Sequence, residues 1–363
     1  MKNPFVTNGY VSPEYFCDRE KETAKIVSLL TNENNIALIS PRRLGKTDLL
    51  RHCFGQPEIK EHYHTFIIDI YATSSVRDFV NVFGKAVLDE LRPKGKSVWG
   101  TFLNVLASLR SEITFDMNGQ PTWGIGLGAI TNPSATLDEI FSYLNNAGKP
   151  CLIAIDEFQQ ITKYADDPNI EAALRTHIQR CSNAHFVFSG SHRHLMGAMF
   201  TSPARPFYQS VTLINLPPIS VDKYAEFCLK HFERVSKHLD TLVVTELYER
   251  FNGITSYMQK VMNILFSMTG TGEICIPSMI DTAINDLLDF SADTYDVFMA
   301  IAAEGKAKAI SSGDFVRKYK LQSASSVSSA VKGLLEKDFI TYDKGIYQVY
   351  DQFFQLWLQR NKL

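Results

Sequence analysis

The sequence predicts an α/β fold in which a parallel sheet is followed by a helical region and a winged helix-turn-helix. Three observations support this. About the first two hundred residues alternate short apolar runs with amphipathic segments, which is typical of α/β proteins. The apolar runs stop after Pro217–Pro218. From Ser291 onward, three helical segments precede a β-prone pair of segments, the order of a winged helix.

Five apolar runs are the strand candidates of the first region. Each has five to seven residues and is apolar on both faces, as expected of strands covered by helices on both sides. They are Asn35–Ser40, Thr65–Tyr71, Cys151–Ile155, His185–Ser189 and Val211–Leu216. The amphipathic segments between them predict helices over Lys46–Phe54, Val76–Leu91, Leu137–Asn146 and Asn169–Cys181.

One segment interrupts this alternation. Residues 113–127 have β-prone flanks around Asn118–Gly119, which predicts an inserted hairpin. Gly124, Gly126 and Gly128 follow no apolar strand and precede no helix. We therefore interpret these glycines as part of the hairpin and not as a dinucleotide fingerprint.

The chain divides into three expected domains. Residues 1–217 form the α/β core. Residues 218–290 form a helical lid without strand candidates, with helices at Lys223–Phe232 and Leu242–Phe251. Residues 291–363 form the winged helix and a C-terminal helix, and the helices expected before the wing are Thr294–Ala303, Ser312–Tyr319 and Ala324–Lys337.

The composition excludes several classes of protein. With 45% hydrophobic and 21% charged residues, the chain is not intrinsically disordered. A net charge of −2 argues against a protein that coats nucleic acid or anionic membrane. No apolar run is long enough to span a membrane, and the N-terminus lacks the apolar stretch of a signal peptide. The six scattered cysteines fit neither a zinc site nor a disulfide scaffold, so we expect a soluble cytoplasmic protein with reduced thiols.

The segment Ser40–Thr47 (SPRRLGKT) lies between a predicted strand and a predicted helix, the context of a P-loop. Gly45 allows the backbone amides to face phosphate oxygens, and the helix that follows directs its positive end to the same place. Lys46 can reach the β- and γ-phosphates, and the Thr47 hydroxyl can bind Mg²⁺. Ser40 stands where the pattern has its first glycine. The nucleotide-binding candidates are Ser40, Pro41, Arg42, Arg43, Leu44, Gly45, Lys46, Thr47 and Asp48.

A second motif, LIAIDE at Leu152–Glu157, is an apolar strand that ends in two carboxylates. Asp156 is placed to hold Mg²⁺ as a Walker B residue. Glu157 is the candidate to polarise the attacking water. Alone, two acids after a strand more often form a solvated loop or a helix cap. Together with the P-loop they predict an ATPase that uses ATP and Mg²⁺, with Lys46 and Glu157 as its catalytic residues.

A third strand, HFVFS, is followed by small polar residues. Ser189 or Ser191 is a candidate sensor of the γ-phosphate, and an N-cap for the helical segment that starts at His192 explains the pattern equally well. We expect His192 and His194 to be surface residues rather than metal ligands.

An ordered set of motifs resembles the archaeal-type P-loop ATPase family of the STAND group, whose architecture is similar to that of AAA+ replication initiators. The set includes FCDREKE, SPRRLGKTDLL, IDEFQQI, FSGSHRHLM, PFYQS and YDQFFQLWL. The resemblance implies a five-stranded parallel ATPase core, a helical lid and a winged helix. It also implies that the segment with Arg19 and Glu20 borders the adenine pocket. The same segment is explained by a helix start with Asp18 as its N-cap, and the two interpretations are compatible.

Two departures from the family concern catalysis. The family arginine is absent at Ser210, where Arg205 or Arg193 could replace its charge. Residues 253–259 lack the basic residue of a sensor 2. We therefore expect hydrolysis to be slow or to depend on a partner that supplies an arginine. Many family members continue into a nuclease-like domain, and the sequence motifs give no reason to expect nuclease activity.

The winged helix has ten basic and eight acidic residues from position 291, a formal charge of +2. Tight duplex binding commonly involves about 6–10 phosphate contacts, so DNA is the less favoured partner. Packing against the ATPase core or a protein partner, including self-association, is slightly favoured. The sequence thus predicts a switch in which the nucleotide state rearranges the lid and the winged helix. The alternatives are a DNA-binding regulator or a partner-recruiting scaffold in which nucleotide is mainly structural.

Overall fold

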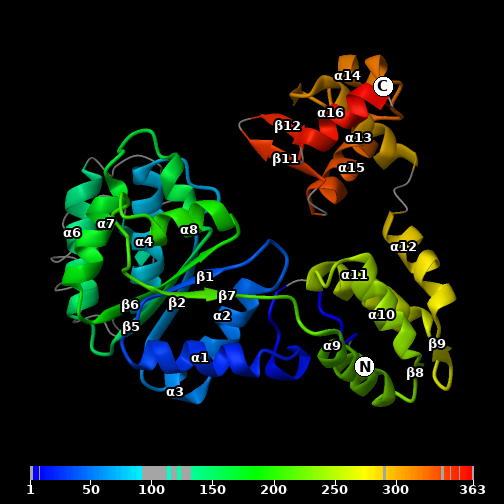
Figure 1. The fold of residues 1–363 in the computed structure, drawn as a ribbon. Helices are drawn as coiled ribbons and strands as arrows, with labels where there is room; N and C mark the ends of the chain where they lie inside the picture. The colour runs from blue at the N-terminus through cyan, green and yellow to red at the C-terminus, as the bar shows by residue number, and fades with distance from the viewer. Residues whose placement is uncertain are drawn as a thin grey trace. The chain divides into compact units, whose positions relative to one another are not determined.

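The computed structural model describes residues 3–7, 9–91, 113–115, 121–123, 132–288, 292–336, 339–343, 345–350 and 352–361. It divides into two compact units, Met1–Ile280 and Asp281–Leu363 (Figure 1). Each unit has its own hydrophobic core. None of the helices in the described residues combines the length and the apolar character that a membrane crossing requires.

A five-stranded parallel sheet forms the centre of the first unit. The predicted strands are all present, with ends shifted by at most two residues. The central strands β1, β5 and β6 are buried along their whole length, which accounts for their mostly apolar sequences. In spatial order the strands are β2 (His64–Asp69), β5 (Cys151–Asp156), β6 (Ala184–Gly190), β1 (Ile36–Ile39) and β7 (Thr212–Asn215).

Helices cover both faces of this sheet (Figure 1). Alternate strand residues face opposite sides, so Ile36 and Leu38 belong to one core cluster, and Ala37 and Ile39 to the other. The first cluster includes α1 (Glu20–Thr31), α2 (Lys46–Phe54) and α3 (Pro57–Lys60). The second includes α4 (Val76–Leu91), α6 (Pro133–Asn145), the 3₁₀ helix η4 (Phe158–Lys163), α7 (Ile170–Arg180) and α8 (Arg193–Thr201).

The described part of the inserted segment contains two short strands. β3 (Ile113–Phe115) pairs antiparallel with β4 (Pro121–Trp123), and Thr114 lies opposite Thr122. The predicted turn at Asn118–Gly119 and the glycines at 124, 126 and 128 lie outside the described residues.

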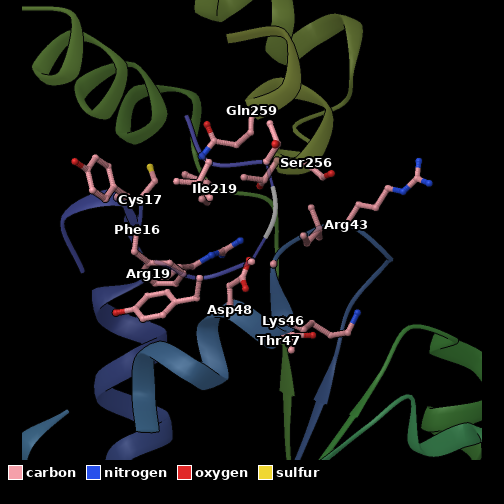
Figure 2. A pocket seen from close by; sticks show the side chains of 18 of the residues that line it. Phe16, Cys17, Arg19, Arg43, Lys46, Thr47, Asp48, Ile219, Ser256 and Gln259 are labelled. Carbon is pink, nitrogen blue, oxygen red and sulfur yellow. The ribbon is translucent and has the colours of Figure 1, made fainter. Parts of the chain in front are cut away.

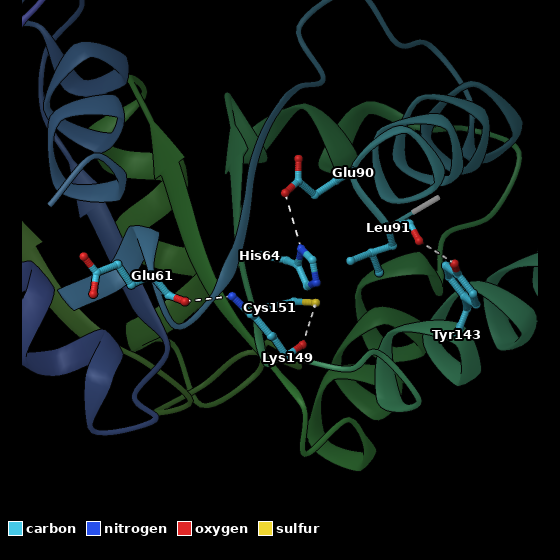
Figure 3. A network of polar contacts seen from close by, with 7 residues as sticks. All are labelled: Glu61, His64, Glu90, Leu91, Tyr143, Lys149 and Cys151. Carbon is cyan, nitrogen blue, oxygen red and sulfur yellow. Dashed lines mark hydrogen bonds and ion pairs between the residues drawn. The ribbon is translucent and has the colours of Figure 1, made fainter. Parts of the chain in front are cut away.

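The amino-terminal edge of the sheet, opposite the phosphate loop, is held by polar contacts (Figure 3). His64 and Cys151 begin neighbouring strands, and His64 Nδ1 lies 3.4 Å from Glu90 Oε1. Tyr143 donates a hydrogen bond of 2.8 Å to the Leu91 carbonyl, which secures the end of α4. Burial raises the pKa of Cys151 to about 12, so its thiol is a small apolar group, and all six cysteines are free and buried.

The helical region after the sheet contains α9 (Val221–Glu233), α10 (Thr241–Arg250) and α11 (Thr255–Met268). The expectation of no strands here was wrong, because β8 (His238–Leu239) pairs in parallel with β9 (Ile274–Cys275). Strands of two residues are too short to produce an alternating pattern, so sequence periodicity cannot detect them.

The N-terminal segment packs against this helical region. The Phe5 ring lies 5.7–6.0 Å from the rings of Phe227, Phe232 and Phe266. The segment continues through a 3₁₀ turn, η1 (Pro13–Tyr15), to α1. The predicted Asp18 cap of α1 was wrong: Arg19 is the N-cap residue, and both residues have positive φ.

The second unit is a winged helix, as predicted. α12 (Ile280–Leu288), which follows the 3₁₀ turn η5 (Pro277–Met279), leads into it. Its helices are α13 (Ala292–Glu304), α14 (Gly313–Lys318), α15 (Ala324–Glu336) and the C-terminal α16 (Gln352–Asn361). Its antiparallel sheet has the order β10 (Ala307–Lys308), β12 (Ile346–Val349) and β11 (Ile340–Asp343).

Candidate active site

The phosphate loop joins the carboxyl end of β1 to the start of α2. Gly45 has a φ of +81°, a left-handed conformation that favours glycine, and it is the N-cap residue of α2. Ser40 is fully buried, and its hydroxyl donates a hydrogen bond of 2.9 Å to the Pro41 carbonyl. A serine at this position is therefore compatible with the opening turn of the loop.

Lys46 and Thr47 begin α2 (Figure 2), close to the carboxyl end of β5, where Asp156 lies. Lys46 is only 6% exposed, and its Nζ lies 3.4 Å from the carbonyl oxygens of Ser40 and Pro41. Burial lowers the pKa of Lys46, and the charges of Asp156 and Glu157 oppose this shift. The basic group is thus enclosed between its own loop and two carboxylates.

Thr47 and Asp156 contact each other directly, although 109 residues separate them in the chain. The Thr47 hydroxyl donates to Asp156 Oδ2 at 2.5 Å. Asp69 ends the neighbouring strand β2 opposite Asp156, and burial raises its pKa. Two side-chain oxygen atoms are adjacent here, and oxygen is the atom type that Mg²⁺ prefers. The residues therefore fit a magnesium site.

Glu157 follows Asp156 and has a φ of +54°. Its Oε2 accepts a hydrogen bond of 2.7 Å from the Ser191 hydroxyl and a second bond from Gln159 Nε2. Its backbone amide donates to Asp156 Oδ1 at 3.0 Å. Both carboxylates are therefore held in fixed orientations beside the phosphate loop.

A cavity of about 320 Å³ connects the phosphate loop to an aromatic wall and to the lid (Figure 2). Phe16 is stacked on His52 at 4.4 Å, and Tyr10 Oη lies 3.0 Å from His52 Nδ1. Ile219 adds an apolar surface. Thr255, Ser256 and Gln259 line the cavity from the lid helix α11.

The structure brings most of the predicted site residues to this cavity. Those that line it are Arg19, Arg42, Arg43, Leu44, Gly45, Lys46, Thr47, Asp48, Asp156 and Glu157. Arg19 donates 2.7 Å to the Pro217 carbonyl and pairs with Glu22 at 3.0 Å. Burial raises the pKa of Asp48, whose carboxylate lies 4.0 Å from Arg51 Nη1.

Other candidates do not line the cavity. Ser40 and Pro41 contribute carbonyl oxygens to Lys46, and Glu20 is exposed at the start of α1. Ser189 is fully buried in β6, and its hydroxyl has no hydrogen-bond partner among the described residues. Arg193 is exposed in α8, and Arg205 forms an ion pair with Glu171 instead of facing the phosphate loop.

Sequence reasoning missed three contributions to this site. The N-terminal segment lines the cavity through Val6, Thr7, Gly9, Tyr10 and Val11. Gln159 donates a hydrogen bond to Glu157. The only sequence signal for this contact is that Gln159 follows Glu157 by two residues. The lid approaches through Tyr257, which accepts a hydrogen bond from Arg43, and no sequence pattern connects those two residues.

A five-stranded parallel sheet, a phosphate loop at its carboxyl edge and a following winged helix define a P-loop ATPase fold. Residues 16–261 match the family described as an ATPase domain predominantly from Archaea, and residues 277–360 match a probable winged helix domain. The first match spans most of the chain. The protein belongs to this ATPase family.

Solved structures similar to the chain have the same fold. A Walker-type ATPase of Pyrococcus abyssi has 18% identity and a TM-score of 0.52, over 98% of this chain and 99% of that chain. The ORC2 protein of Aeropyrum pernix has 14% identity and a TM-score of 0.52, over 98% and 96%. Cdc6p of Pyrobaculum aerophilum has 12% identity and a TM-score of 0.50, over 98% and 96%. A comparison with curated proteins gives no match.

Proposed function

We propose that this protein binds ATP with Mg²⁺ and hydrolyses it, and that nucleotide state controls the position of the lid. One observation carries the proposal: the Thr47–Asp156 contact, at 2.5 Å, lies in the same cavity as Lys46 and Glu157. These four groups are the ones that phosphoryl transfer from ATP needs. The similar ORC2 structure is described as holding ADPNP and ADP, which supports a nucleotide ligand.

Each residue has a distinct role in this proposal. The loop amides and Lys46 bind the phosphate oxygens, and the enclosed position of Lys46 strengthens its attraction to anions. Thr47 and Asp156 hold Mg²⁺, which neutralises charge on the phosphates when bound. Glu157 accepts a hydrogen bond from the attacking water. The wall formed by Phe16 and Ile219 packs against the adenine ring.

The switch proposal rests on contacts between the phosphate loop and the lid helix α11. The Arg43 side chain donates to Tyr257 Oη, and its guanidinium lies 4.9 Å from the centre of the Tyr257 ring. The Ser256 amide donates 3.2 Å to the Arg43 carbonyl. Residues 253–259 of the lid contain no basic residue, and Arg43 of the phosphate loop makes the contact with this segment. A change in loop conformation on hydrolysis would be transmitted directly to the lid.

The test is ATP binding and turnover in the full chain. We expect Lys46→Ala to abolish ATP binding measured by calorimetry, and Glu157→Gln to keep binding while losing turnover. Lys60→Ala, at an exposed lysine in α3, is the matched control and should behave like the wild type. ATP binding that survives Lys46→Ala unchanged would refute the proposal.

The alternative of a DNA-binding regulator draws on the winged helix and on a similar structure, Aeropyrum pernix ORC1, described as a complex with DNA. Two basic residues of this unit are already paired with acids, Arg317 with Asp314 and Lys318 with Glu304. We therefore propose that the partner of the winged helix is a protein and not DNA. A salt titration of DNA binding separates the two, because several phosphate contacts produce a steep salt dependence.

A further inference from the structure

The Glu157 carboxylate is held by two side chains that belong to neither nucleotide-binding motif. Both donate to the same oxygen, Oε2: Ser191 follows β6 and donates at 2.7 Å, and Gln159 donates from η4. Within the described part of the chain, Oε1 accepts no hydrogen bond. Two donors on one oxygen fix the plane of a carboxylate that would otherwise rotate freely.

Ser191 is itself fixed from the phosphate loop. Arg42 Nε donates to the Ser191 hydroxyl at 3.4 Å, across 149 residues of sequence. The Arg42 guanidinium also lies 5.3 Å from the centre of the Tyr71 ring, just beyond β2. Because a hydroxyl has one proton, accepting from Arg42 directs that proton toward Glu157. The loop and the carboxylate are thus connected through a single serine.

Gln159 is fixed by packing. It is 3% exposed, and its amide lies against Gly190 so closely that a Cβ added to Gly190 would be 2.4 Å from Gln159 Oε1. Glycine at position 190 leaves the space that the amide needs. Of the two amide orientations, only the one with Nε2 toward Glu157 is attractive, because a carbonyl oxygen would repel the carboxylate.

We propose that Ser191 and Gln159 are positioning residues, which hold Oε2 of Glu157 and leave Oε1 to act as the base; this rests on the proposed ATPase function. The attacking water gives a proton to Oε1 as its oxygen forms a bond to the γ-phosphorus. The bond between that phosphorus and the bridging oxygen breaks, and its electron pair leaves with ADP. Ser191 and Gln159 touch neither the water nor the phosphate in this step.

The experiment measures kcat, KM and ATP dissociation constants of the full chain for Ser191→Ala, Ser191→Thr, Gln159→Met and Gln160→Ala. We expect Ser191→Ala and Gln159→Met to lower kcat about 10- to 100-fold, since misplacing a catalytic group has effects of this size. ATP affinity should change by less than about twofold. Ser191→Thr keeps the hydroxyl and should restore most of kcat.

Gln160→Ala is the matched control, because Gln160 donates to the Thr73 carbonyl and not to Glu157. Methionine at 159 keeps the size of the side chain without its donor, and thermal unfolding checks that each variant folds. The inference would be overturned if kcat were unchanged or higher in both Ser191→Ala and Gln159→Met, provided that Glu157→Gln abolishes turnover. A wild type whose turnover is the same as that of Glu157→Gln would overturn the proposed function, and the inference with it.

Discussion

The two units of this protein place their charged groups in opposite ways. In the first unit, charged and polar side chains from distant parts of the sequence converge on one cavity, as Thr47 and Asp156 do. In the winged helix, ion pairs join residues close in sequence and lie at the surface. Arg317 and Asp314 are 80% and 91% exposed, and Lys318 pairs with Glu304 fourteen residues away.

The difference matters because buried and exposed charges act on their surroundings with different strength. The electrostatic interaction of a buried charge with a ligand is strong, because little water lies between them. Exposed ion pairs are screened by solvent and salt. We therefore expect the proposed reaction in this cavity. The winged helix has the shape of a DNA-binding module, and acids on its own surface already pair with part of its positive charge. Four predictions test this contrast.

The largest effect is expected at the Thr47–Asp156 pair. Asp156→Asn removes the negative oxygen that would hold Mg²⁺, so we expect ATP turnover to fall by about 100-fold. Part of the loss should return at high Mg²⁺ concentration, because weaker binding is compensated by mass action. Asp138→Asn changes an acid that is 72% exposed and serves as control. If both variants had the same Mg²⁺ dependence, Asp156 would not be a metal ligand.

The second prediction concerns the space beside Gln159. Gly190→Ala forces a methyl group within 2.4 Å of Gln159 Oε1 and 2.5 Å of Met196 Sδ. Overpacking of this kind costs about 1–3 kcal/mol, which denaturant unfolding measures. Turnover should fall as well, because Gln159 is displaced from Glu157.

Gly197→Ala in α8 is the matched control, since nothing lies within 4 Å of the added Cβ. Helix propensity predicts that this change stabilises the protein by about 0.5–1 kcal/mol. Equal unfolding free energies for the two variants would contradict the tight packing at Gly190.

Features that are encoded locally in the chain could be predicted from the sequence. The helices at Lys46–Phe54 and Val76–Leu91 have the expected bounds because each boundary is encoded locally. In α2, for example, Gly45 precedes the first turn and Gly55 follows the last. The strand–loop–helix order of the phosphate site is local in the same way, so its residues could be named from the sequence.

Contacts between distant segments could not be predicted in this way. Phe5 packs on the lid and Arg43 reaches Tyr257, and neither contact leaves a periodic pattern near the residues involved. Asp18 was a reasonable helix cap by residue type. Its backbone has a φ of +56°, and the helix begins one residue later than that cap requires. Tertiary packing determines these features.

A smaller effect is expected at the contact between phosphate loop and lid. Tyr257→Leu removes the ring beneath Arg43, a contact worth about 0.5–2 kcal/mol. We expect ATP to protect the lid from limited proteolysis less well in this variant, while ATP affinity changes only a few-fold. Tyr257→Phe keeps the ring and should behave nearly like the wild type. If ATP protected the lid of Tyr257→Leu from proteolysis as well as that of the wild type, the Arg43–Tyr257 contact would have no part in the switch.

The smallest effect is expected in the winged helix. Glu304→Gln releases Lys318, whose Nζ donates to the Glu304 carboxylate at 2.6 Å. We expect the full chain to bind duplex DNA weakly, with a shallow dependence of log K on log salt concentration. Each lysine released to a phosphate steepens that slope by about 1, so this variant should show a change of about that size.

Asp296→Asn provides the control, because it also removes one negative charge, from an exposed acid that forms no ion pair among the described residues. If Glu304→Gln steepens the slope and Asp296→Asn does not, pairing with Glu304 is what withholds Lys318 from DNA. Equal slopes for both variants would assign any change to net charge alone. In that case the pairing of Lys318 with Glu304 would not explain weak DNA binding. The two units would then differ only in how deeply their charged groups are buried.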